Sequence, residues 1–165
     1  MHINFETLRN YQLKEECILL TSKGYSMAPF IQEPVQIYVK CCVPENIKKG
    51  DIVVFYDEKA VVCHRCIDVN GDLFLERGDN CCLFCFPEWR SKNAVIGIVI
   101  GIVKKNRMIL VDKFKWYREV VLMIAKYSYK FAYKNSVDKE MKGSVLGKLL
   151  FLVSYIILQL ESRKK

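Results

Sequence analysis

The feature that most constrains the fold is a series of seven short apolar runs, each closed by turn residues, that ends near residue 112. The runs are 17–22, 35–43, 52–56, 61–69, 73–77, 94–105 and 107–112. The turn from Asn70 to Asp72, with Gly71 at its centre, is typical of a β-hairpin between two of them. Gly97 and Gly101 mark expected bulges or bends in the longest run. Because no helical pattern alternates with the runs, the sequence predicts a mainly β body over residues 1–112.

The pattern changes at residue 113 and becomes helical. Residues 113–134 contain no Gly or Pro, and polar residues recur there at helical spacing: Lys115, Glu119, Lys126, Lys130 and Lys134. A polar linker, 135–144, separates this segment from a strongly apolar one, 145–160. The sequence therefore predicts that residues 113–165 form a C-terminal α-helical hairpin appended to the β body.

The positive charge of the chain is concentrated in this tail. The net charge is +8, and residues 104–165 carry 15 Lys/Arg against 5 Asp/Glu. Basic amphipathic helices with aromatic residues are typical of anionic membrane surfaces. A helix over 145–160 would be about 24 Å long, shorter than the roughly 30 Å hydrocarbon core of a bilayer. We expect a membrane-associated protein, held peripherally or by a C-terminal anchor through residues 113–160. It would be cytoplasmic if the tail does not bind lipid, and helices that cover the β body or form a dimer are the alternative.

Eight cysteines allow either buried thiols or a metal site. They are Cys17, Cys41, Cys42, Cys63, Cys66, Cys81, Cys82 and Cys85. The first 17 residues lack the apolar stretch of a signal peptide, so we expect reduced thiols. Two C-x-x-C pairs, Cys63/Cys66 and Cys82/Cys85, have zinc-ribbon spacing. The first pair lies in a predicted strand, which puts its two thiols on opposite faces. We predict no metal and no cofactor, and a zinc ribbon remains the alternative.

The hexapeptide Gly-Tyr-Ser-Met-Ala-Pro at 24–29 provides a candidate nucleophile. Ser26 stands between the flexible Gly24 and the rigid Pro29, directly after a predicted strand. This arrangement exposes a hydroxyl group and directs backbone N–H groups at one point, and acyl transfer needs both. A serine in a turn can also be an ordinary turn residue, so the motif alone leaves the question open.

His64 is the candidate general base. It lies within the predicted strand 61–69, and the only other histidine is His2, near the beginning of the chain. Histidine is the side chain whose ordinary titration range suits it to take a proton from serine near neutral pH. Asp79, in the Gly-Asp-Asn turn at 78–80, could orient the imidazole by accepting its other N–H. Asp before Asn is also common turn chemistry, which is the structural alternative.

Four motifs in order give the sequence a family resemblance. GYSMAPF, KKGDIVVFYD, VVCHRCIDV and RGDN together resemble the signal peptidase I family and the related LexA-like self-cleaving repressors, over roughly residues 20–103. Histidine in the second conserved strand resembles the Ser–His branch, which includes endoplasmic reticulum, archaeal and spore-former signal peptidases. The resemblance implies a coiled all-β catalytic fold and a serine endopeptidase that cleaves signal or leader peptides. Its substrate would be an extended peptide bound as an added β-strand, cut after small side chains.

The resemblance assigns three roles to residues of this chain. It implies Ser26 as nucleophile, His64 as base and Asp79 as the acidic partner. Around the nucleophile, we expect Gly24, Met27 and Pro29 to form the oxyanion and substrate-binding site. Gly24 stands where many signal peptidases have a hydroxyl residue. A second acidic residue expected after Gly-Asp-Asn has only Glu88 as a substitute.

Two non-enzymatic alternatives remain. One is a repressor-like or zinc-ribbon binding module with a basic tail, and the other is a silent relative that only binds leader peptides. No helix-turn-helix pattern precedes the β body, so no nucleic-acid partner is expected.

Overall fold

The computed structural model describes residues 16–28, 30–31, 35–42, 44–58, 60–80, 87–104, 107–123 and 125. The protein is mainly β, as the sequence predicts. Its strands are β1 (Cys17–Ser22), β2 (Val35–Cys41), β3 (Ile52–Asp57), β4 (Ala60–Asn70), β5 (Leu73–Arg77), β6 (Glu88–Ser91), β7 (Val95–Lys104) and β8 (Arg107–Leu110). Three 3₁₀ turns complete the list: η1 (Pro44–Asn46), η2 (Lys92–Ala94) and η3 (Val111–Phe114).

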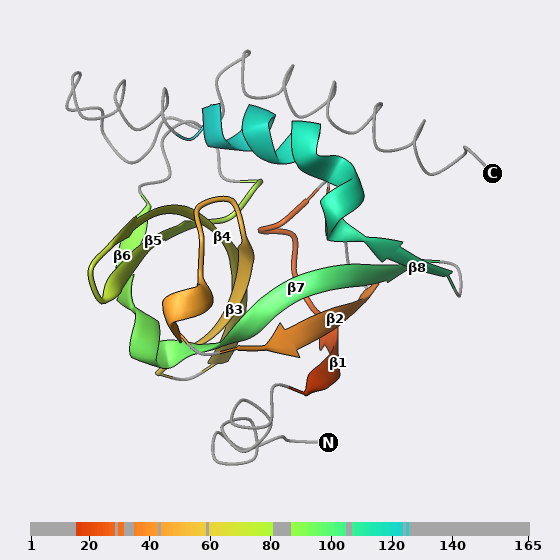
Figure 1. The fold of residues 1–165 in the computed structure, drawn as a ribbon. Coiled ribbons are helices and arrows are strands. Elements are labelled where there is room, and N and C mark those ends of the chain that lie inside the picture. The colour runs from red at the N-terminus through yellow and green to blue at the C-terminus, as the bar shows by residue number, and fades with distance from the viewer. Residues whose placement is uncertain are drawn as a thin grey trace.

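All described strands belong to one antiparallel sheet. Its order is β1-β2-β7-β3-β4-β5-β6, and β8 pairs with β7. Figure 1 shows β3, β4, β5 and β6 curling round one side of the body, while β1, β2, β7 and β8 form the other. The sheet is therefore coiled rather than flat.

The predicted hairpin and the predicted bulges are both present. β4 and β5 pair from Asn70↔Leu73, so the Asn-Gly-Asp turn joins them as expected. The register of β2 against β7 shifts beside Gly101, and that of β3 against β7 shifts beside Gly97. Strand β6 was not predicted, because it is four residues long and two of them are charged.

Two hydrophobic clusters lie on opposite faces of β3 and β4. One includes Ile52 and Val54 together with Tyr117, and the other includes Val53 and Phe55. This alternation follows from the two-residue period of a strand. The same alternation holds in β4 from Ala60 to Cys66, before the register shift between Cys66 and Asp68.

A helix beginning at residue 115 packs on the sheet. It is described over 115–123 and at residue 125, and Figure 1 shows it lying across the top of the β body. Tyr117 is 1% exposed in the first cluster, and Ala125 packs with Ile67 and Leu75 in a third. The predicted helix is thus confirmed over its first part. Residues 126–165, including the predicted second helix, lie outside the described residues.

Within the part of the chain that the structure describes, we find no helix with the length and apolar character needed to cross a bilayer.

Candidate active site

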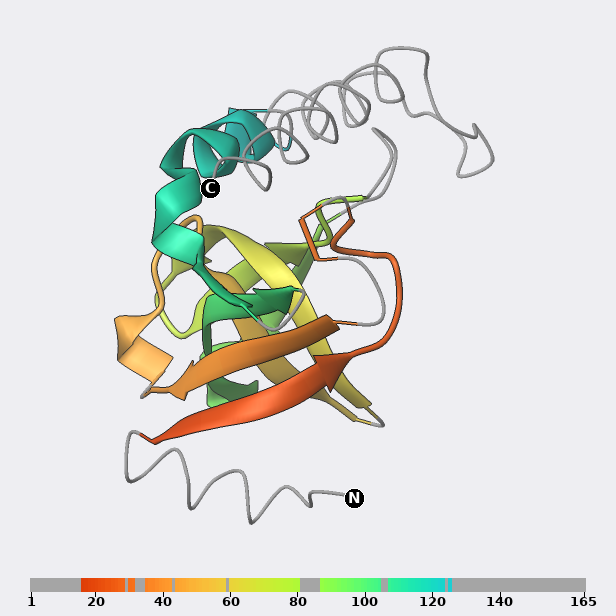
Figure 2. The same cartoon turned by 90° about the vertical axis from the view of Figure 1, so that its right-hand side faces the viewer.

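The segment that carries Ser26 lies against the turn that follows β5. The N–H of Asn80 donates to the carbonyl oxygen of Ser26 at 2.8 Å. Figures 1 and 2 show the two segments side by side. A Cβ built on Gly78 would lie 2.5 Å from the Ser26 carbonyl oxygen and 3.2 Å from the Ser26 Cβ. Only glycine leaves room for this approach, so the Gly-Asp-Asn turn positions Ser26.

The sheet register indicates where His64 lies relative to this turn. Arg65 pairs with Arg77, the last residue of β5; His64 directly precedes Arg65, and Gly78 directly follows Arg77. Extending the ladder by one residue, beyond its last pair, would set Gly78 and His64 opposite each other on one face of the sheet. Since Ser26 covers the Cβ direction of Gly78, this extension would put the serine over the face of His64.

The residues around Ser26 leave its hydroxyl accessible. Ser26 and Tyr25 are exposed, whereas Met27 and Ala28 are each only 3% exposed and anchor the turn. The N–H of Ala28 donates to the Tyr25 carbonyl at 3.0 Å. Among the described residues, no backbone carbonyl accepts a hydrogen bond from the N–H of Ser26 or of Met27.

Gly24 provides the bend that leads into this turn. Its φ of +117° is disfavoured for residues with a side chain, and nothing lies within 4 Å of the Cβ position. Its role is therefore conformational, at the step from β1 to the Ser26 turn. Pro29 lies outside the described residues.

Glu76, which the sequence analysis missed, holds the imidazole. His64 Nδ1 lies 2.6 Å from Glu76 Oε2. The two side chains are 20% and 7% exposed, respectively. Phe55 packs edge-on against the imidazole, with ring centroids 6.3 Å apart. Because an ionised carboxylate only accepts, this contact puts the proton of a neutral imidazole on Nδ1 and leaves Nε2 as an acceptor.

The structure corrects the role given to Asp79. Its two carboxylate oxygens accept from Arg65 Nε and Nη2 at 2.7 and 2.6 Å, and both side chains are buried, at 0% and 2% exposure. Arg65 alternates with His64 along β4 and so projects from the opposite face. Asp79 binds Arg65 on that opposite face, whereas Glu76 lies on the same face as His64.

Arg65 joins four parts of the fold. Besides Asp79, it binds the carbonyl oxygen of Gly50 through Nη1 at 2.8 Å. Its guanidinium lies 5.8 Å from the ring centre of Phe30 and 5.9 Å from that of Tyr117. Burial lowers the pKa of Arg65, but the charge of Asp79 and the hydrogen bonds to it outweigh burial and raise it. Arg65 is therefore a permanent buried cation that connects the Ser26 segment, the Gly-Asp-Asn turn and the helix.

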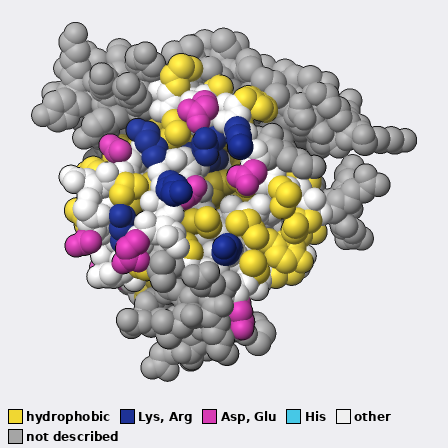
Figure 3. All heavy atoms as spheres, in the orientation of Figure 1, with side chains coloured by type: hydrophobic (Ala, Val, Ile, Leu, Met, Phe, Trp, Pro, Cys, Tyr) yellow, Lys and Arg dark blue, Asp and Glu magenta, His cyan; other side chains and the backbone are white. Residues whose placement is uncertain are grey.

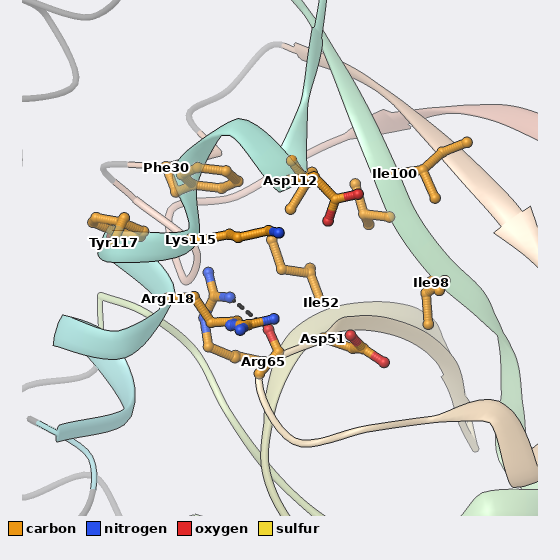
Figure 4. Close-up of a pocket in the computed structure, with 13 residues that line it drawn as sticks. Phe30, Asp51, Ile52, Arg65, Ile98, Ile100, Asp112, Lys115, Tyr117 and Arg118 are labelled. Atoms are coloured by element: carbon orange, nitrogen blue, oxygen red, sulfur yellow. Dashed lines mark hydrogen bonds between the residues drawn. The ribbon is translucent and has the colours of Figure 1, made fainter.

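A separate pocket lies on the Arg65 side of the sheet. It has a volume of about 140 Å³, and its lining includes Arg65 but neither Ser26 nor His64. Figure 4 shows Asp51, Lys115 and Arg118 around it, beside Arg65. Burial raises the pKa of Asp51, against the opposing effect of a backbone hydrogen bond and neighbouring cations. On the face drawn in Figure 3, acidic and basic side chains are intermixed, and no described histidine is visible.

The first C-x-x-C pair does not converge on one point. Cys63 packs at the first cluster and Cys66 in the second, on opposite faces of β4, as its spacing predicts. Burial raises the pKa of both thiols to about 12. The other pair, Cys82 and Cys85, lies outside the described residues. Among the described residues, no group of three or more metal-ligating side chains is found.

Comparison with protein-family models, with curated proteins and with solved structures finds no match for this chain. The assignment of a function therefore depends on the geometry of the site and on the four sequence motifs.

Proposed function

We propose that this protein is a serine endopeptidase of the signal-peptidase type, with Ser26 as nucleophile and His64 as general base. The observation that supports it is the close approach of Ser26 to Gly78, which directly follows the Arg65↔Arg77 pair next to His64. Glu76 replaces Asp79 as the carboxylate that orients His64. The resemblance to the Ser–His branch of signal peptidases, and to the LexA-like fold, rests on the same residues.

The proposed mechanism is acyl transfer in two steps. Nε2 of His64 takes the hydroxyl proton of Ser26 as Oγ attacks the scissile carbonyl, and Glu76 stabilises the resulting imidazolium. The N–H groups of Ser26 and Met27 donate to the oxyanion. His64 then gives its proton to the leaving amine, and a water activated by His64 hydrolyses the acyl-enzyme.

The substrate we propose is an extended signal or leader peptide. β5 pairs with β4 only from Arg65 to Asn70, so Ala60–His64 has no strand partner on that edge among the described residues. β1, which leads to Ser26, pairs only with β2 in the same part of the chain. A peptide that adds to an open strand edge gains main-chain hydrogen bonds. The edge at Ala60–His64 would guide its scissile bond toward His64 and Ser26.

Covalent labelling tests this site without knowledge of the substrate. A fluorophosphonate probe is expected to phosphonylate the full-length protein at Ser26, as located by mass spectrometry of the digested protein. His64→Ala should slow the labelling by about 10²–10⁴-fold, the usual contribution of general base catalysis. Ser91→Ala, which changes another serine, should leave it unchanged. Labelling at another serine, or equal rates in His64→Ala and the unaltered protein, would contradict the proposal.

We further propose that residues 113–160 bring the peptidase to a membrane surface. Within the described part of this tail, Lys115 and Met123 are exposed on the helix whose other face packs on the sheet. The full chain is expected to co-sediment with anionic vesicles more than with neutral ones, and salt should weaken the binding. Equal binding to both vesicle types, or preference for DNA of the same charge, would contradict this.

A further inference from the structure

β6 contributes an arginine that extends the contact between His64 and Glu76. Arg90 Nε lies 3.4 Å from Glu76 Oε1, the oxygen that His64 does not use. This distance is longer than a strong hydrogen bond, so the contact is an ion pair. The register explains the proximity, since Glu76 pairs with Glu88 and Phe74 pairs with Arg90 on neighbouring strands. Each oxygen of the Glu76 carboxylate thus has its own cationic or donor partner.

Arg90 is itself fixed from a third strand. Its Nη1 and Nη2 donate to the two oxygens of Asp57, at the end of β3, at 3.2 and 3.3 Å. Nη2 also lies 2.7 Å from Glu88 Oε2. The Asp57 contact is a two-point fork, which fixes the plane of the guanidinium as well as its position. The Glu88 side chain is 63% exposed and contacts only Nη2, so it adds little to that orientation.

We propose that Arg90 is a positioning residue of the peptidase site: anchored by Asp57, it holds the Glu76 carboxylate in place, aimed at Nδ1 of His64. This inference rests on the proposed function only for its kinetic consequence. The Glu76 side chain is 7% exposed, and a carboxylate so far removed from water needs a cation or several donors. Neutral His64 supplies one donor and no charge, and Arg90 supplies the charge. With Glu76 held in this way, His64 keeps its proton on Nδ1 and presents Nε2 to Ser26.

Kinetics provide the first test. Arg90→Met is expected to lower kcat for peptide cleavage about 10–100-fold, by analogy with the loss of outer partners at metal-bound histidines. KM should stay unchanged, because the open edge at Ala60–His64 is not contacted by Arg90. Glu88→Gln, the matched control, removes the third and most exposed carboxylate partner of Arg90 and should leave both constants unaltered. A change in KM alone, or equal losses in both variants, would overturn the proposal.

A spectroscopic test separates this inference from the proposed function. The chain has two histidines, so His2→Gln leaves His64 as the only one, and ¹⁵N-histidine labelling reports its tautomer directly. At a pH where His64 is neutral, the unaltered site should show a protonated Nδ1 and a bare Nε2, and so should Glu88→Gln. Arg90→Met should shift the population toward the other tautomer, in a protein whose amide spectrum remains folded.

The two tests fail in different ways. Loss of the fixed Nδ1–H tautomer in Arg90→Met supports the positioning role even if no peptide is cleaved, in which case the proposed function fails alone. An unchanged tautomer in a folded Arg90→Met protein overturns the positioning role even if the peptidase is active.

Discussion

Ser26→Ala is expected to abolish peptide cleavage while leaving the folded protein as stable as before. Loss of the nucleophile from a serine peptidase lowers kcat by about 10⁶-fold, because the base and oxyanion site have no partner with which to act. The Ser26 side chain is exposed, and the contacts that hold its turn run through its backbone. The measurement is mass-spectrometric mapping of new N-termini in leader-bearing peptides incubated with each purified protein.

A second serine gives the matched control. Ser91 accepts a hydrogen bond from the N–H of Asn93 at 3.2 Å and caps a 3₁₀ turn. Ser91→Ala should cost about 0.5–2 kcal/mol of stability and leave cleavage intact, the reverse of Ser26→Ala. Cleavage by Ser26→Ala at the rate of the unaltered protein would remove the nucleophile from the proposal.

Asp79→Asn is expected to produce the largest loss of stability. The substitution leaves Arg65 as a buried cation with no countercharge beside it, and breaking a buried ion pair in this way costs about 3–5 kcal/mol. For a chain of this size that corresponds to a fall in Tm of roughly 6–20 °C. Urea unfolding followed by circular dichroism measures the change directly.

An exposed aspartate provides the comparison. Asp68 lies 3.9 Å from Lys49, and both side chains are more than half exposed, so Asp68→Asn should change stability by less than about 1 kcal/mol. The same pair of variants separates the two readings of Asp79. If Asp79→Asn kept its stability and lost only kcat, Asp79 would be a catalytic residue and the structural role would be wrong.

The strands and the outline of the site are readable from the sequence for different reasons. Turn residues delimit the strands, so β1, β3, β4 and β5 fall within one or two residues of their predicted bounds. Ser26 and His64 are candidates from the sequence because the serine stands between Gly and Pro residues and histidine is rare in this chain. The Gly-Asp-Asn turn lies against Ser26 because the two backbones approach each other closely at Gly78. The hydrophobic pattern of the sequence gives no sign of this contact.

The partner of His64 was missed because it depends on sheet register. The turn at Asn70–Asp72 predicts the β4–β5 hairpin, but regular pairing from that turn would put Glu76 opposite Ile67, on the face away from His64. The register shifts between Cys66 and Asp68, so that Glu76 pairs with Cys66 and shares the face of His64. The sequence does not reveal a bulge of this kind, which changes which residues meet. The contact of Arg90 with Glu76 could not be predicted from the sequence, because the sequence of β6 is too short and too polar to be recognised as a strand.

The stack of Phe30 on Tyr117 has a consequence for how this protein can be divided. The two rings are 5.2 Å apart and nearly parallel, at 14°. Phe30 follows Ser26 by four residues, and Tyr117 belongs to the tail. A fragment that stopped at residue 112 would lack Tyr117 and would expose both Phe30 and the guanidinium of Arg65. The segment that carries Ser26 would then lose part of the packing that supports it. The described start of the tail thus packs as part of the β body, through Tyr117 in its first hydrophobic cluster.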